Sequence, residues 1–182
     1  MTKIKRNKKV VCLLLAITIT ICFGTTSFAF IYLSSGYESA SIQIENRTIT
    51  YSDQFIASKN AWNATSTPAW ITAVAGSGNN WIDDDVYTDT WNGEYVPVTL
   101  QYVLFGRATK FHIRLNRSLL VNESSNFRRS VIVHELGHAL CLNDNPSNTI
   151  NTKNNSIMNY MRDRDVLISP TQDDIDGVND AY

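Results

Sequence analysis

The sequence predicts a single α+β domain in which short strands precede a helix that carries a pair of histidines. Alternating and apolar runs typical of strands are spread over residues 41–115. From Phe127 onward, apolar residues and two histidines recur at three- and four-residue steps, the period of a helix. Residues 30–182 are enough for one domain with a sizeable core. Strands first and a helix afterwards indicate the α+β class.

The first strands and helices follow one another along the chain. Residues 41–44 and 48–50 alternate like short strands, and residues 53–64 show the pattern of an amphipathic helix. Residues 70–74 predict the next strand, which the glycine- and asparagine-rich residues 76–80 end.

A second pair of strands is predicted before the histidine helix. Residues 96–105 and 109–115 have strand character, and Gly106 and Arg107 suggest the turn between them. His112 lies within the second of these runs, which places it on a sheet.

A cluster of acidic residues has two open interpretations. Asp83, Asp84, Asp85 and Asp89 offer the oxygen ligands that Ca²⁺ prefers. They lack the spacing of a recognised calcium loop, and such clusters commonly form solvated turns. Ca²⁺ binding and a solvated turn therefore both stay open.

The most informative segment is His134-Glu135-Leu136-Gly137-His138. Two histidines four residues apart on a helix project from the same face, so their rings can share one zinc ion. Catalytic zinc takes three protein ligands and keeps its fourth position for water. Glu135 is then placed to act as the general base. Polar residues 122–126 offer N-cap candidates for this helix.

Asp144 is the strongest candidate for the third ligand. A helix continued past residue 140 would point Asp144 away from the two histidines, so the chain must reverse at residues 140–143. Cys141 offers an alternative, since a continued helix could present its thiolate to the metal and close the site to water. His112 is the only other histidine after residue 29.

These segments resemble the metzincin zinc endopeptidases. In the metzincin signature two histidines, a glycine turn and a third His or Asp encircle the catalytic zinc, as His134, His138 and Asp144 would here. Residues 156–160, Ser-Ile-Met-Asn-Tyr, resemble the methionine turn beneath that zinc. Residues 170–182 are similar to the closing helix of matrixin-type catalytic domains, which makes the matrixin type our preferred subfamily.

The resemblance implies a twisted mixed sheet, an active-site helix, a Met-turn at Met158 and a C-terminal helix. It implies that Glu135 is the base and that Tyr160 is a candidate to approach the zinc and steady the oxyanion. It also implies that a peptide substrate pairs with the sheet edge beside the cleft. Residues 161–169 would help to shape the pocket for the residue just beyond the scissile bond.

Two residues depart from the usual metzincin pattern. Cys141 stands where family members carry glycine, and a left-handed conformation there would cost a residue with a Cβ roughly 1 to 2 kcal/mol. Asn143 tolerates that conformation better, but a turn there would come later in the chain. Asp144 replaces the commoner third histidine and reduces the positive charge available to polarise substrate.

The N-terminus predicts a secretory signal. Residues 1–9 are basic, an apolar run follows, and Ser27-Phe28-Ala29 suggests cleavage after Ala29. The alternative is an uncleaved membrane anchor, because the apolar stretch continues to residue 33. We therefore assign residues 1–29 to a signal peptide, 30–40 to a short N-terminal segment and 41–182 to the catalytic domain of a secreted protein.

The charge of the mature chain limits its partners. Loss of residues 1–29 would remove five of the 16 Lys and Arg and leave 11 against 17 Asp and Glu, a net charge of −6. This acidic balance disfavours nucleic acid and anionic membrane surfaces. Cys141 would then be the single cysteine, so no internal disulfide is expected.

Two functions of different classes follow from these patterns. The first is hydrolysis of protein or peptide substrates by one zinc ion, with Glu135 as general base. The second is a non-catalytic, zinc-stabilised binding module that kept the metal ligands. The substrate preference and the oligomeric state are not encoded in any pattern that we identify.

Overall fold

A five-stranded sheet forms the frame of the molecule. The computed structural model describes residues 30–76, 78–98, 106–146 and 153–182. The strand order is β2-β1-β3-β5-β4, and all pairs are parallel except the antiparallel pair of β4 with β5. The strands are β1 (Ser41–Asn46), β2 (Trp70–Val74), β3 (Asn80–Asp85), β4 (Gly93–Pro97) and β5 (Phe111–Asn116).

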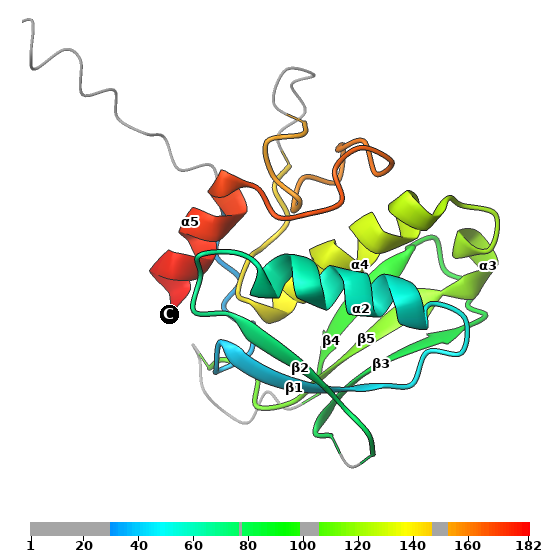
Figure 1. Cartoon of the computed structure of the whole chain (residues 1–182), viewed down its shortest axis with the longest axis horizontal. Coiled ribbons are helices and arrows are strands. Elements are labelled where there is room, and N and C mark those ends of the chain that lie inside the picture. The colour runs from blue at the N-terminus through cyan, green and yellow to red at the C-terminus, as the bar shows by residue number, and fades with distance from the viewer. Residues whose placement is uncertain (1–29, 77, 99–105, 147–152) are drawn as a thin grey trace, which may run out of the picture.

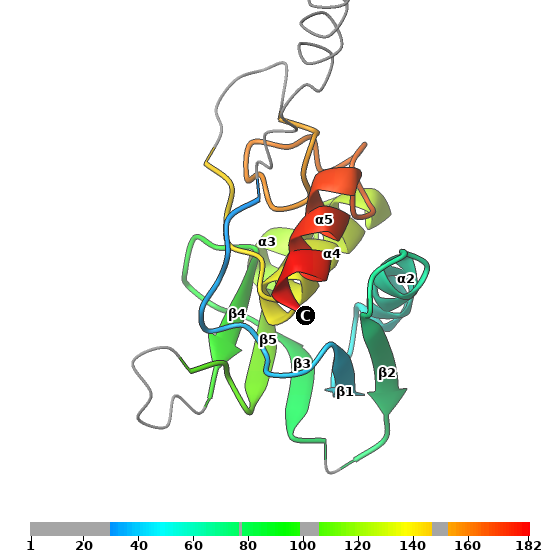
Figure 2. The ribbon, with the colours of Figure 1, turned by 90° about the vertical axis from the view of Figure 1, so that its left-hand side faces the viewer.

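Helices cover one face of this sheet. They are α2 (Ser52–Asn63), the short α3 (Arg117–Leu120), α4 (Ser125–Ala139) and α5 (Gln172–Ala181). Figures 1 and 2 show α2 and α4 side by side on the sheet, with α5 beyond the end of α4. The Trp62 indole N–H of α2 donates to the carbonyl of Val133 in α4 at 2.9 Å, which joins the two helices in the core.

The core lies between the helices and the inner face of the sheet. Alternate strand residues point into it, among them Ile42 and Ile44 of β1 and Phe111, Ile113 and Leu115 of β5, all fully buried. This period of two is the basis of the strand predictions. The mixed sheet and the helices confirm the prediction of a domain that combines α and β structure.

Residues 48–50 do not form the predicted strand. The backbone N–H groups of Ile49 and Thr50 instead donate to the carboxylate of Asp84 in β3. A buried side chain from a distant strand thus satisfies the backbone of this segment, which leads into α2.

The acidic residues 83–85 belong to a strand and not to a turn. Asp84 is 5% exposed, and Arg117 lies 3.6 Å from its carboxylate. Because successive side chains of a strand point to opposite faces, the three carboxylates do not converge. Within residues 30–76, 78–98, 106–146 and 153–182, the one group of three metal-ligand side chains that comes together lies elsewhere.

The second predicted pair of strands is correct in part. The strand that we expected over residues 96–105 is β4, which begins earlier, at Gly93, and ends at Pro97; residues 99–105 lie outside the described residues. The other is β5. His112 lies on it, and its ring stacks on Trp81 with centroids 4.8 Å apart, so it is a sheet residue as predicted.

The N-terminal segment runs beside the turn that follows α4. Leu33 donates its N–H to the carbonyl of Cys141 at 2.7 Å, and Asn143 donates to Ile31 at 2.7 Å. The predicted signal peptide, residues 1–29, lies outside the described residues. None of the helices described here has the length and apolar character to cross a bilayer.

Candidate metal centre

Helix α4 presents both histidines of the motif. Its N-cap is Ser124, whose hydroxyl accepts the N–H of Phe127 at 3.0 Å. This cap lies within the polar run that offered N-cap candidates, and it satisfies one of the free N–H groups at the helix start. His134 and Glu135 are both buried on the helix. The predicted helix is therefore confirmed, with its motif on the buried side.

The chain reverses directly after α4. Cys141 adopts a positive φ of 70°, the single non-glycine case among the described residues. The N–H of Leu142 donates to Gly137 at 3.0 Å and that of Cys141 to His138 at 3.1 Å. These two bonds form a Schellman motif, in which glycine normally takes the left-handed position. The predicted reversal at residues 140–143 is confirmed, and Cys141 rather than Asn143 makes the turn.

The Cys141 thiol points away from the histidines. Its Sγ lies 3.3 Å from the hydroxyl of Tyr182 and 3.6 Å from the carbonyl of Tyr37. The alternative in which this thiol completes a closed metal site therefore does not fit the structure.

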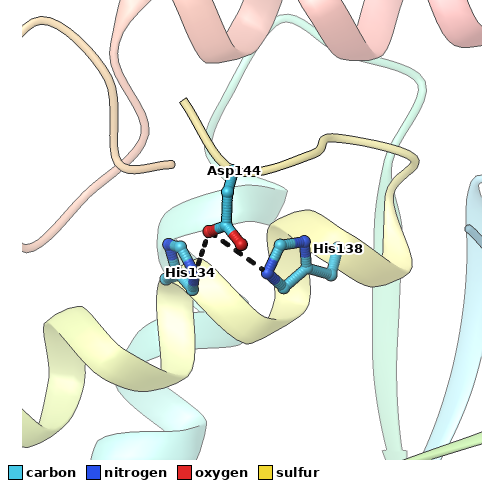
Figure 3. Close-up of side chains that lie close together, drawn as sticks. All are labelled: His134, His138 and Asp144. Carbon is cyan, nitrogen blue, oxygen red and sulfur yellow. Dashed lines mark ion pairs between the residues drawn. The ribbon is translucent and has the colours of Figure 1, made fainter. Parts of the chain in front are cut away.

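The turn brings Asp144 over the two histidines (Figure 3). Its Oδ1 lies 3.2 Å from Nε2 of His134 and 3.7 Å from Nε2 of His138. The three ligand atoms all lie within 4.8 Å of one another. Two imidazoles and one carboxylate in this arrangement can hold a divalent metal ion, and nitrogen and oxygen donors of this kind suit zinc.

Backbone carbonyls orient both imidazole rings. Nδ1 of His134 lies 3.0 Å from the carbonyl of Ile157, and Nδ1 of His138 lies 2.8 Å from that of Leu142. Because a carbonyl can only accept, each Nδ1 carries the proton, and each Nε2 turns its lone pair toward the shared site. Burial lowers the pKa of both histidines, which keeps the rings neutral and ready to bind a metal at neutral pH.

Arg162 is a buried cation beside His134 that the sequence analysis missed. It donates to the hydroxyl and carbonyl of Ser130 at 3.0 and 3.1 Å, and to the carbonyl of Asn159 at 3.0 Å. Its Nη1 also lies 3.2 Å from Nδ1 of His134, but that nitrogen donates to Ile157, so we interpret this contact as proximity. Burial lowers the pKa of Arg162 to about 9. No local pattern marks this arginine, because its partners come from α4 and the turn.

Glu135 lines a cavity that opens beside the metal group. The cavity has a volume of about 330 Å³ and is lined by residues of α4, β4, the N-terminal segment and the Asp144 loop. Burial and the negative charge of Asp144 raise the pKa of Glu135 to about 8. A metal ion in the site would oppose this shift, since a nearby cation favours the ionised carboxylate.

Gly93 allows β4 to approach α4 closely at Glu135. A Cβ at this position would lie 2.9 Å from both Cγ and Oε1 of Glu135. The backbone N–H of Tyr95, two residues along β4, donates to the same carboxylate. The edge strand of the sheet therefore holds the predicted general base in place.

Met158 is buried against Gly137, the glycine between the two histidines of the motif. A Cβ on Gly137 would lie 2.4 Å from its Sδ, so the glycine of the motif makes room for the methionine. Asp174, at the start of α5, accepts the Ile157 N–H at 2.9 Å and the Ser156 hydroxyl at 2.6 Å. These contacts join the turn at residues 156–158 to the start of α5, and the Ile157 carbonyl of the same turn lies against His134. That this turn is a metzincin Met-turn stays a prediction.

Tyr160 is 47% exposed and does not line the cavity described above. A role for it at the oxyanion stays a prediction.

Comparisons with known proteins add no relative. No protein-family model matches this chain, and no curated protein matches it either.

Proposed function

We propose that this chain is a zinc-dependent hydrolase of peptide bonds. The observation that carries the proposal is the convergence of His134, His138 and Asp144 in a cavity that the buried Glu135 also lines. Three protein ligands beside a cavity match a catalytic zinc site, which keeps one position open, better than a structural site, which is closed. The resemblance of the motif, the turn at Met158 and the C-terminal helix supports a secreted endopeptidase of the metzincin class, most similar to the matrixin type.

The residues of the chain have distinct tasks in this proposal. Zinc, when bound, supplies Lewis acidity that makes water a nucleophile near neutral pH and polarises the substrate carbonyl. Glu135 takes the proton of the attacking water and passes it to the leaving amine. The carbonyls of Ile157 and Leu142 hold the imidazoles in the tautomer that can bind the metal.

Strand β4 is the best candidate for binding the peptide main chain. It is the antiparallel edge strand, and Gly93, Glu94, Tyr95 and Pro97 line the cavity. Asn92 and Val98 bond to the β5 side, so the alternation of an antiparallel pair turns the backbone of Gly93 and the carbonyl of Tyr95 toward the free edge, while the Tyr95 N–H is taken by Glu135. An extended peptide can add to this edge by main-chain hydrogen bonds.

The proposed hydrolysis is tested by substituting the general base, Glu135, while the three metal ligands are kept. Purified residues 30–182 should hydrolyse denatured protein and lose activity to a chelator. The variant Glu135→Gln should retain one zinc per chain by elemental analysis and lose at least about 100-fold in kcat/KM, the lower range of general-base contributions. Glu38→Gln is the matched control and should keep full activity, because Glu38 is exposed and does not line the cavity.

Two results would contradict the proposal. Hydrolysis by Glu135→Gln at the parent rate would remove Glu135 from the mechanism. Stoichiometric zinc with no hydrolysis of broad peptide libraries by the parent protein would favour the non-catalytic binding module.

A further inference from the structure

A second cavity adjoins the metal group. It has a volume of about 200 Å³ and shares Gly93, His134 and Glu135 with the first. Only the first cavity reaches His138 and Asp144, so the second opens on another side of Glu135. Its remaining walls come from residues 90–92, from Val131, and from two arginines after the Met158 turn, Arg162 and Arg164.

Arg164 is the unusual member of this cavity. Its Nε is buried without a hydrogen-bond partner, and it makes no ion pair with any residue that the structure describes. Its guanidinium lies 5.2 Å from the centre of the Phe127 ring, which fixes its position. A half-buried guanidinium stays charged, and a buried donor without a partner destabilises the protein. Such a side chain therefore favours binding of an anionic acceptor.

Arg162 adds positive charge but is not available for a ligand. Its guanidinium donates to Ser130 and Asn159 as described above, which commits its nitrogen atoms to the protein. In this cavity the guanidinium of Arg162 is therefore bonded to the protein, whereas that of Arg164 has no ion-pair partner among the described residues. The single acidic residue among its lining residues is Glu135.

The position of the cavity indicates which part of a substrate enters it. In the proposed function Glu135 passes a proton to the leaving amine, so the residue that carries this amine lies next to Glu135. The second cavity is lined by Glu135 and is therefore beside that residue. Arg162 and Arg164 form one of its walls.

We propose that this cavity selects substrates with an acidic side chain, glutamate or aspartate, directly after the scissile bond, and that Arg164 is the specificity residue. The proposal rests on the proposed function. A carboxylate in the cavity would pair with the guanidinium of Arg164, which lines the cavity, in a charge-assisted hydrogen bond. An apolar side chain would leave this guanidinium without an anionic partner, and a basic side chain would be repelled by both arginines.

The experiment compares peptides that differ at one residue. Fluorogenic peptides carry Glu, Gln, Leu or Lys after the scissile bond and are otherwise identical. We expect the parent protein to cleave the Glu peptide with a kcat/KM at least about tenfold above the Gln peptide, the ratio typical of a hydrogen bond to a charged group. The variant Arg164→Gln should lose this preference while it still cleaves the Gln peptide, and Arg164→Glu should prefer the Lys peptide.

A charge-matched control variant and a binding assay distinguish an effect of Arg164 on substrate preference from a general effect of charge or a loss of folding. Arg47→Gln removes an exposed arginine that pairs with Glu45 and should keep the preference for Glu. Anisotropy of the labelled Glu and Gln peptides on the Glu135→Ala variant measures binding without hydrolysis. Circular dichroism and zinc content establish that each Arg164 variant is folded.

Each result has a definite meaning. Cleavage that is equal or better with Leu than with Glu, or a Glu preference that survives in Arg164→Gln, overturns this proposal and leaves the hydrolytic function standing. Tighter binding of the Glu peptide without hydrolysis by the parent overturns the hydrolytic function but supports a carboxylate-binding cavity. If the parent protein shows neither hydrolysis nor selective binding of the Glu peptide, the hydrolytic function and the carboxylate-binding cavity are both overturned.

Discussion

Cys141 occupies a backbone conformation that most residues avoid. With φ at 70°, it makes the turn that brings Asp144 to the histidines. A side chain with a Cβ costs roughly 1 to 2 kcal/mol in this conformation relative to glycine. The buried contacts of its thiol with Tyr182 and Tyr37 offset part of this cost. One residue thus combines a strained turn with packing against the C-terminal helix.

We expect Cys141→Gly to bind zinc with unchanged stoichiometry. Glycine relieves the strain of the turn but loses the packing of the thiol, so the free energy of unfolding should change by less than about 1 kcal/mol. Elemental analysis and urea denaturation measure the two quantities. Asp144→Ala is the positive control and should lose the metal. Loss of zinc in Cys141→Gly itself would make the thiol a ligand and contradict the site as described.

Helix α4 and the turn at Met158 fit together at one contact, between Gly137 and Met158. Gly137 has no side chain, and Met158 fills the space that a Cβ would take. Asp174 in turn ties this turn to the start of α5 by accepting the N–H of Ile157 and the hydroxyl of Ser156. The helix with two ligands, the turn beneath it and the last helix are therefore one connected unit.

Gly137→Ala should destabilise the protein although alanine favours helices. The gain in helix propensity is about 1 kcal/mol, but the new Cβ would overlap Met158, and overpacking of this kind costs about 1 to 3 kcal/mol. We expect a lower midpoint of urea unfolding. In a double-mutant cycle, the same substitution should cost less in the Met158→Ala background, where the overlap is removed. Equal costs in both backgrounds would show that Met158 is not the obstacle.

At the scale of the whole molecule, the buried Glu135 should make the stability of the metal-free protein depend on pH. Its folded pKa of about 8 lies above the usual value of 4.5, so the folded state binds the proton more tightly than the unfolded state. The stability that this carboxyl contributes is therefore present below pH 4.5 and is lost as the pH rises to about 8. His134 and His138, whose pKa values are lowered, act in the opposite direction below about 6.5.

The comparison with Glu135→Gln isolates this effect. With a chelator present, the variant should gain stability over the parent as the pH rises from 4.5 to 8, by a few kcal/mol in total, and the difference should then stay constant. Urea denaturation at a series of pH values measures it. A difference that is flat across this range would mean that Glu135 titrates normally in the folded protein.

The parts of the site that depend on local patterns could be predicted from the sequence. The histidines, the N-cap of α4 and the reversal before Asp144 follow from helical period, capping and direction. Arg162 and Arg164 do not, because their roles depend on contacts with α4, which lies about 30 residues earlier in the sequence. Strand β3 was missed for a similar reason: its last residues are acidic, and only the parallel pairing with β5 and the contacts of Asp84 make them part of a sheet.

The pairing of Ile31 and Leu33 with Asn143 and Cys141 has a consequence for how the metal is captured. The loop that ends in Asp144 is already anchored on the N-terminal segment, so little chain entropy is left to lose when an ion arrives. The centre is in this sense preorganised. Metal-free and metal-loaded forms should then superimpose closely around Asp144, and the heat-capacity change on metal uptake should be small, because almost no further apolar surface is buried.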